Sequence, residues 1–297
     1  MTGQVRIKSP WMQLLVLGLV FLPQILLVIF SISASTEIKI DMTDPKLVDE
    51  LKGAQAISSL AFFLLPAFLY SVICFRGRFG FFLGLKKAQL NNMYLLSVLC
   101  IVFSFPVVFW LGTLNESINL PEWMTSMEKD TSTQMEAFLK VNKPTDIIVN
   151  LTVIALIPAF CEEIFFRGAL QRVMIHITKN PWAGIIVTAI LFSALHMQFL
   201  GFLPRMFMGV VLGALYWYSG SLWTCVVAHF VYNAVQVLAV AYLPKLAETN
   251  PEMPVMVGIA SSIAVAAILW FYRKQSTVSY AREYKAEDIE TYNNFPA

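Results

Sequence analysis

Charged side chains are scarce in this chain. They make up 13% of its 297 residues, whereas hydrophobic residues make up 58%; soluble domains contain about 25% charged residues. The net charge is only +2, which gives no indication of a nucleic-acid partner. Several apolar runs approach the roughly 20 residues that a helix needs to cross a hydrocarbon core of about 30 Å. The composition therefore excludes an ordinary soluble domain and favours a membrane protein.

Cysteine is also sparse, and its four occurrences follow no pattern of metal binding or disulfide formation. Each lies within an apolar run, without the paired spacing of a zinc site or a disulfide framework. We expect all four to pack as small buried side chains, and Cys161 to line any site around its neighbour Glu162. The four are Cys74, Cys100, Cys161 and Cys225.

Long apolar runs dominate what is present. An unbroken run satisfies its backbone hydrogen bonds in lipid as a helix, which favours an all-α fold over a barrel. The sequence predicts a polytopic membrane protein with about eight transmembrane helices. The first run is too long for the core of a signal peptide, which is about 7–15 residues. The predicted spans are 11–33, 54–75, 92–114, 147–177, 182–200, 204–218, 222–243 and 254–272.

Charge alternates between the loops that join these spans. Basic residues precede the first span and follow the second, fourth and eighth, whereas loops 35–53 and 115–146 are acidic or mixed. Because basic loops stay in the cytoplasm, both termini are predicted to be cytoplasmic. Loop 115–146 then lies on the outer face and is expected to contain a short amphipathic helix. The basic residues are Arg6, Lys8, Arg76, Arg78, Lys86, Lys87, Arg167, Arg172, Lys179, Arg273 and Lys274.

Two adjacent carboxylates, Glu162 and Glu163, interrupt the fourth apolar run. A charged side chain at the centre of a bilayer costs roughly 2.5–3.5 kcal/mol, so such residues are functional by default. Arg167 lies four residues after Glu163 on the same helix face and is expected to pair with it. Glu162 points about 100° away, which leaves it free to hold a water molecule and accept its proton.

Two histidines and an asparagine lie in other apolar runs. Along straight helices, Glu162 is roughly 25 Å and His196 roughly 22 Å from the turn at Lys179–Pro181. We therefore expect the two side chains at one depth on neighbouring antiparallel helices. His229 and Asn233 are four residues apart and share a face of a later run. An imidazole and an amide can together hold a carbonyl oxygen as negative charge develops on it.

Three motifs within residues 147–240 carry a resemblance to a known family. In this order they are Glu162-Glu163-x-x-x-Arg167, Phe192-x-x-x-His196 and His229-x-x-x-Asn233. They resemble the motifs of the CPBP intramembrane endopeptidases, the CAAX protease and bacteriocin-processing (Abi) family. The resemblance implies an eight-helix fold, a catalytic chamber accessible from the cytoplasm, and endopeptidase activity on membrane-associated peptides or proteins. The compact loops suggest a bacterial host, so we expect the protein in a bacterial plasma membrane.

The same resemblance assigns roles to individual residues. Glu162 is implied to be the catalytic glutamate, with His196 as its partner on the water molecule. His229 and Asn233 are implied to form the oxyanion site. Glu163 and Arg167 would then be the supporting pair.

Three regions follow from the spans and the motifs. Residues 1–146 form an N-terminal three-span region that includes the outer loop, and residues 147–245 form the catalytic helical core. Residues 246–297 contribute the last span and a charged cytoplasmic tail.

The sequence leaves alternatives open both for metal dependence and for function. A zinc site would use His196, His229 and a carboxylate, but the chain lacks a His-Glu-x-x-His pair on one helix, so no cofactor is favoured. A catalytically silent scaffold or bacteriocin-immunity factor is the alternative function. A proton-coupled transporter is less favoured, because the spans show no matching halves. The expected partners are the bilayer and a membrane-associated substrate, and the sequence gives no indication of oligomeric state.

Overall fold

Helices form nearly all of the structure, as the sequence predicts. A computed structural model of the chain describes residues 4–34, 41–77, 79–243 and 253–284. Two short strands in this part pair antiparallel, with Gln4 opposite Arg76, and were not predicted. The elements are β1 (Gln4–Val5), α1 (Pro10–Ala34), α2 (Pro45–Ser59), η1 (Leu60–Leu64), α3 (Leu65–Cys74), β2 (Phe75–Arg76), α4 (Phe79–Phe82), α5 (Asn92–Glu116), α6 (Glu122–Leu139), α7 (Pro144–Asn150), η2 (Leu151–Leu156), α8 (Ile157–Glu163), η3 (Ile164–Gln171), α9 (Arg172–Thr178), α10 (Pro181–Ala194), α11 (Phe202–Ser219), α12 (Leu222–Tyr242), α14 (Val255–Gln275) and α15 (Tyr280–Tyr284).

Six helical stretches in the described part are long and apolar enough to cross a membrane. They match six of the predicted spans, but the count of eight is not confirmed. α10 has only 14 residues, and at about 1.5 Å per residue it is too short for the hydrocarbon core. α11 packs between α10 and α5, and its later half is buried. The six are Pro10–Phe30, Pro45–Cys74, Asn92–Glu116, Pro144–Thr178, Leu222–Tyr242 and Val255–Gln275.

The long helical stretch Pro144–Thr178 carries the two adjacent carboxylates. It matches the predicted span 147–177 and runs from α7 to α9 through two π-helical segments, η2 and η3. A proline inside an α-helix collides with the carbonyl four residues earlier. The wider π turn of η2 lies directly before Pro158, where that carbonyl is located. The stretch ends at Lys179, whose φ of 53° is left-handed, and Asn180 caps α10.

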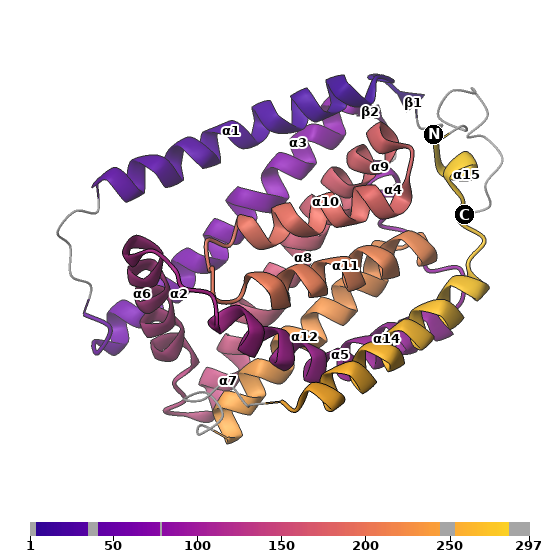
Figure 1. Ribbon diagram of the computed structural model, residues 1–297. Helices are drawn as coiled ribbons and strands as arrows, with labels where there is room; N and C mark the ends of the chain where they lie inside the picture. Colours follow the sequence, from indigo (N-terminus) through magenta and orange to yellow (C-terminus); the bar gives the residue numbers. More distant parts are fainter. Residues whose placement is uncertain (1–3, 35–40, 78, 244–252, 285–297) are drawn as a thin grey trace.

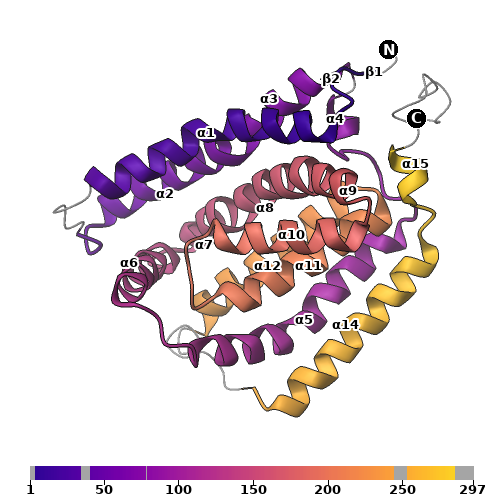
Figure 2. The same ribbon diagram turned by 45° about the horizontal axis from the view of Figure 1, so that its top comes forward.

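The two ends of the helix bundle contain different parts of the chain. β1, β2, α4 and α15 lie at one end, towards the right of Figures 1 and 2, and α6 and the start of α7 lie at the other. We call these the terminal end and the α6 end. α6 confirms the helix predicted within loop 115–146. The first and last described elements share one end, which an even number of crossings requires.

Helices from all three predicted regions pack in this bundle. α5 of the N-terminal region contacts α11 and α12 of the core, and also α14. The division into regions stays a prediction. Most of the predicted tail, and part of loop 35–53, lie outside the described residues.

Candidate active site

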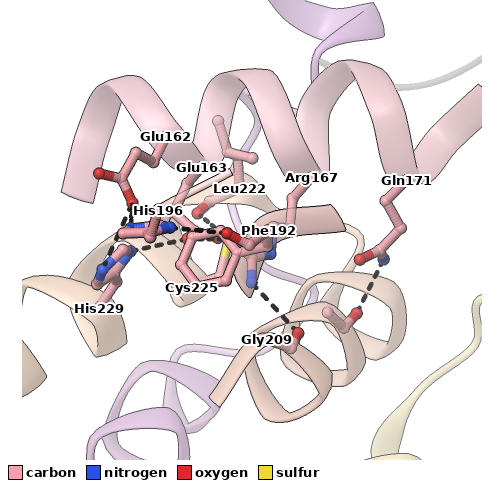
Figure 3. A network of polar contacts seen from close by, with 11 residues as sticks. Glu162, Glu163, Arg167, Gln171, Phe192, His196, Gly209, Leu222, Cys225 and His229 are labelled. Atoms are coloured by element: carbon pink, nitrogen blue, oxygen red, sulfur yellow. Dashed lines mark hydrogen bonds and ion pairs between the residues drawn. The ribbon is translucent and has the colours of Figure 1, made fainter. Parts of the chain in front are cut away.

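The two adjacent carboxylates of α8 contact different neighbours (Figure 3). Glu163 is fully buried. Its Oε1 accepts one hydrogen bond from Arg167 Nη1 at 2.7 Å and another from His229 Nδ1 at 2.8 Å. The ion pair expected between Glu163 and Arg167 is therefore present. The contact with His229 was not predicted, because it joins α8 to the distant helix α12.

Arg167 is enclosed by protein. Its side chain is 0% exposed, and its Nη2 donates to the carbonyl of Gly209 in α11 at 3.2 Å. The guanidinium carbon lies 4.6 Å from the centre of the Phe192 ring. A side chain at Gly209 would bring a Cβ within 2.9 Å of the Ala189 Cβ, so this close approach of α11 requires glycine. The Glu163–Arg167 pair thus ties η3 to α11 and α12.

Glu162 faces two imidazoles instead. Its Oε2 lies 3.7 Å from Nε2 of His196 and 4.0 Å from Nε2 of His229. Both distances are longer than a direct hydrogen bond and suit a bridging water molecule. The equal depth predicted for Glu162 and His196 is confirmed by this contact.

The Nδ1 atoms orient both rings. His196 Nδ1 donates to the carbonyl of Phe192 at 2.7 Å, and His229 Nδ1 donates to Glu163 at 2.8 Å. With Nδ1 engaged in this way, Nε2 of each ring faces Glu162. A histidine whose second nitrogen is fixed in this way presents a defined tautomer and ring orientation.

The position of His196 differs in detail from the prediction. It was expected inside the span 182–200, but α10 ends at Ala194. His196 lies in the following turn, in which Met197 adopts a left-handed φ of 55°. The chain turns here between α10 and α11. His196 nevertheless lies at the predicted depth, beside Glu162.

The polar side chains surround one cavity of about 610 Å³, which we call the chamber. All four residues implied to act in catalysis line it: Glu162, His196, His229 and Asn233. The other two, Glu163 and Arg167, are buried behind this lining. The structure therefore brings together all six candidate site residues.

The expectation for Cys161 was wrong. Cys161 is buried but is not among the residues that line the chamber. Successive residues of a helix point about 100° apart, so the neighbour of Glu162 faces elsewhere. The buried cysteine next to the motif residues is Cys225 of α12, whose thiol donates to the carbonyl of Leu222 at 3.0 Å (Figure 3). All four cysteines are buried and free, as expected.

Helix α6 forms a wall of the chamber, which the sequence did not indicate. Its lining residues follow the spacing of one helix face: Thr131, Gln134, Met135, Phe138 and Leu139. Two further contacts hold α6 in place. Glu128 accepts a hydrogen bond from the backbone of Leu200 at 2.8 Å, and the rings of Trp123 and Phe199 lie 5.5 Å apart.

Arg205 is a second unpredicted residue of the chamber. It lies in the first turn of α11, where a positive charge opposes the helix dipole, so helix stability does not explain it. Its Nη1 donates to the carbonyl of Gln198 at 3.1 Å, and its Nη2 to the side chain of the same residue. Among the described residues no carboxylate forms an ion pair with it. An arginine inside a predicted span was the available signal.

The donor atoms do not form a recognisable metal site. Within the described residues, no group of three or more His, Cys, Asp and Glu side chains is placed to hold a metal ion. The Nε2 atoms of His196 and His229, with Glu162, are the nearest approach to the zinc site considered above.

Comparisons with known proteins agree with the motifs. Residues 144–235 match the family of Rce1-like type II CAAX prenyl endopeptidases. This match confirms the resemblance to the CAAX proteases over the segment that holds Glu162, His196, His229 and Asn233. Together with the six apolar helices, it supports an integral membrane protein with a segment similar to the CAAX proteases.

One curated relative is similar over the same length of chain. The uncharacterized protein YpbD of Bacillus subtilis (strain 168) is 33% identical over 92 residues, which are 30% of this chain and 44% of the relative. The chain thus spans less than half the length of that relative. No solved structure gives a significant match.

Proposed function

We propose that the protein is an intramembrane endopeptidase that hydrolyses peptide bonds of membrane-associated peptides or proteins. The observation that supports this most strongly is that Glu162, His196 and His229, from three separate segments of the chain, converge on one polar chamber. The match to the CAAX-protease family supports the same reaction. The Bacillus relative supports a bacterial host, and the six apolar helices support the plasma membrane as the location. The basic residues near the chain ends support cytoplasmic termini.

In this proposal Glu162 is the general base. A water molecule held between Glu162 and Nε2 of His196 attacks the carbonyl carbon of the scissile bond. Glu162 accepts the proton of that water and then transfers it to the departing amine. His196 keeps the water in place, because the carbonyl of Phe192 fixes its ring.

His229 and Asn233 bind the oxyanion that forms on the attacked carbonyl. An imidazole that donates Nδ1–H to Glu163 can also donate from Nε2 only when it carries both protons. The Glu163 carboxylate, 2.8 Å from Nδ1, stabilises that imidazolium. Asn233, one helical turn further along α12, adds an amide donor from the same wall. Glu163 thus acts on the reaction through His229, as a positioning residue.

Peptide cleavage by the purified protein tests the proposed endopeptidase activity. Protein in liposomes is incubated with a library of membrane-tethered peptides, and products are identified by mass spectrometry. Sequence-specific products are expected. A folded protein that cuts no member of a broad library would favour the silent scaffold or immunity factor.

We expect hydrolysis without a metal ion. Exhaustive chelation, with metal content measured alongside, should leave the cleavage rate unchanged, because Glu162 itself activates the water. Loss of activity on chelation, restored by adding zinc, would instead assign His196 and His229 as metal ligands.

We expect Arg205 to bind a carboxylate group of the substrate. A hydrogen bond to a charged group contributes about 1.5–3 kcal/mol, so Arg205→Gln should raise KM by about 10- to 100-fold with little change in kcat. The matched comparison uses one peptide with and without its carboxylates. Wild-type protein should prefer the acidic form, and Arg205→Gln should not. An equal fall in kcat on both peptides would contradict this role and place Arg205 at the oxyanion.

A further inference from the structure

The chamber lies in the half of the bundle that is remote from the chain termini. Its lining residues come from α6, from the Pro144–Thr178 stretch up to Glu162, from the turn between α10 and α11, and from α11 up to Leu212. Gln55 of α2 and Phe192 of α10 complete this part of the wall. α12 contributes only its middle part, from His229 to Val237. None of the lining residues belongs to β1, β2, α4, α9 or α15, which form or adjoin the terminal end.

Close packing separates the chamber from the terminal end. Gln171 Nε2 donates to the carbonyl of Gly213 at 3.0 Å, one helical turn beyond the contact of Arg167 with Gly209. A Cβ added to Gly213 would lie 2.6 Å from the Gln171 side chain, and one added to Gly168 would lie 2.8 Å from the carbonyl of Leu83. The described cavity on the far side of this layer has a volume of only about 20 Å³, room for about one water molecule.

The two ends of the bundle also carry opposite charge. At the terminal end, the described residues include ten Lys and Arg side chains and one carboxylate, Glu283. At the α6 end, residues 41–53 and 116–146 include ten Asp and Glu side chains and five Lys. The ten basic residues are Arg6, Lys8, Arg76, Lys86, Lys87, Arg172, Lys179, Arg273, Lys274 and Arg282.

These observations conflict with one pair of earlier expectations. Cytoplasmic termini and a chamber accessible from the cytoplasm require both features at the same end, and the structure places them at opposite ends. The excess of Lys and Arg decides which end is cytoplasmic in membrane proteins. That rule selects the terminal end.

We propose that the chamber opens to the non-cytoplasmic side of the membrane. Its substrates are then peptide segments in the outer leaflet, or segments that have already crossed the membrane, and not the cytoplasmic tails of prenylated proteins. This inference rests on the proposed function for the nature of the reaction, but the direction of opening follows from packing and charge alone. The acidic α6 is the first element that such a substrate meets.

Cysteine labelling tests the direction without any need for activity. The four native cysteines are at most 1% exposed and should not react. Three single variants are made: Ser132→Cys on the exposed face of α6, Gln134→Cys in the chamber wall, and Asn91→Cys in the loop before α5 at the terminal end. Spheroplasts expressing each variant are treated with a membrane-impermeant maleimide, before and after permeabilisation.

The inference predicts labelling of Ser132→Cys and Gln134→Cys in intact spheroplasts, and of Asn91→Cys only after permeabilisation. The reverse pattern would overturn the orientation. Labelling of Ser132→Cys from outside with Gln134→Cys reached only from inside would overturn the opening direction. Each outcome is read only from variants that keep the wild-type melting temperature. If Ser132→Cys misfolds, Thr133→Cys, at the adjacent exposed position of α6, takes its place.

A second measurement separates this inference from the proposed function. One cleavable peptide is tethered to the outer face of the membrane in one strain and to the cytoplasmic face in another. Cleavage of the outer peptide alone is expected, and cleavage of the cytoplasmic peptide alone would overturn the inference. If neither is cut while the labelling pattern is as expected, the protease function fails and the direction of opening stands.

Discussion

Replacing Glu162 by glutamine should abolish peptide cleavage and leave the fold intact. General-base catalysis contributes about 10²- to 10⁴-fold to a rate, and a glutamine cannot accept the proton of the attacking water. Glu162 makes no direct hydrogen bond in the described structure and is 8% exposed to the chamber. Its loss should therefore change stability little. The measurement is kcat on a membrane-tethered peptide, with the melting temperature recorded on the same preparation.

An exposed glutamate provides the control for this variant. Glu50→Gln, on the exposed side of α2, makes the same chemical change at a residue that does not line the chamber, and it should keep the wild-type rate. Cleavage by Glu162→Gln at more than about a tenth of the wild-type rate would contradict the assignment of the general base.

Glu163→Gln should destabilise the protein and also slow peptide cleavage. The substitution leaves Arg167 buried without its counter-charge, and removing one partner of a buried ion pair costs about 3–5 kcal/mol. It also removes the charge that faces Nδ1 of His229 at 2.8 Å. We expect a clearly lower melting temperature and a lower kcat. Thermal unfolding in detergent and cleavage of the tethered peptide measure the two effects.

The neighbouring substitution is the matched control for this prediction. Glu162→Gln and Glu163→Gln make the same chemical change one residue apart, and only the second should lower the melting temperature strongly. If Glu163→Gln fails to fold, the double variant Glu163→Gln, Arg167→Gln should recover stability, because it leaves no uncompensated charge. Normal melting with lost activity in Glu163→Gln would place that carboxylate in the chemistry itself.

Local sequence patterns predicted those parts of the site that lie on one helix or one hairpin. The pairing of Glu163 with Arg167 follows from a spacing of four residues. The common depth of Glu162 and His196 follows from the rise per residue on either side of the turn at Asn180. Both are present in the structure.

Features that depend on packing between distant segments were missed. Nothing in the spacing of His229 indicates that its Nδ1 reaches Glu163 of another helix. The place of α6 is set by its contacts through Glu128 and Trp123 with the loop after α10, and amphipathic periodicity does not encode those contacts. α10 is shorter than its apolar run because Met197 leaves the helical conformation.

Composition and hydropathy predicted the fold class, whereas the predicted count of eight spans is not confirmed. The run 204–218 was predicted to be a span, but its helix, α11, is not among the six stretches apolar enough to cross a membrane, and it packs against α5, α10 and α12. Burial inside protein and burial in lipid select similar side chains, so hydropathy alone does not distinguish them.

Hydrolysis in oxygen-18 water tests the central claim most directly. Wild-type protein and Glu162→Gln, matched in melting temperature, are incubated with one tethered peptide in liposomes, and the products are analysed by mass spectrometry. The account predicts a single new carboxyl terminus carrying oxygen-18 from the wild-type protein and no product from the variant. Equal product from both proteins, or none from folded wild-type protein with any peptide of the library, would contradict it.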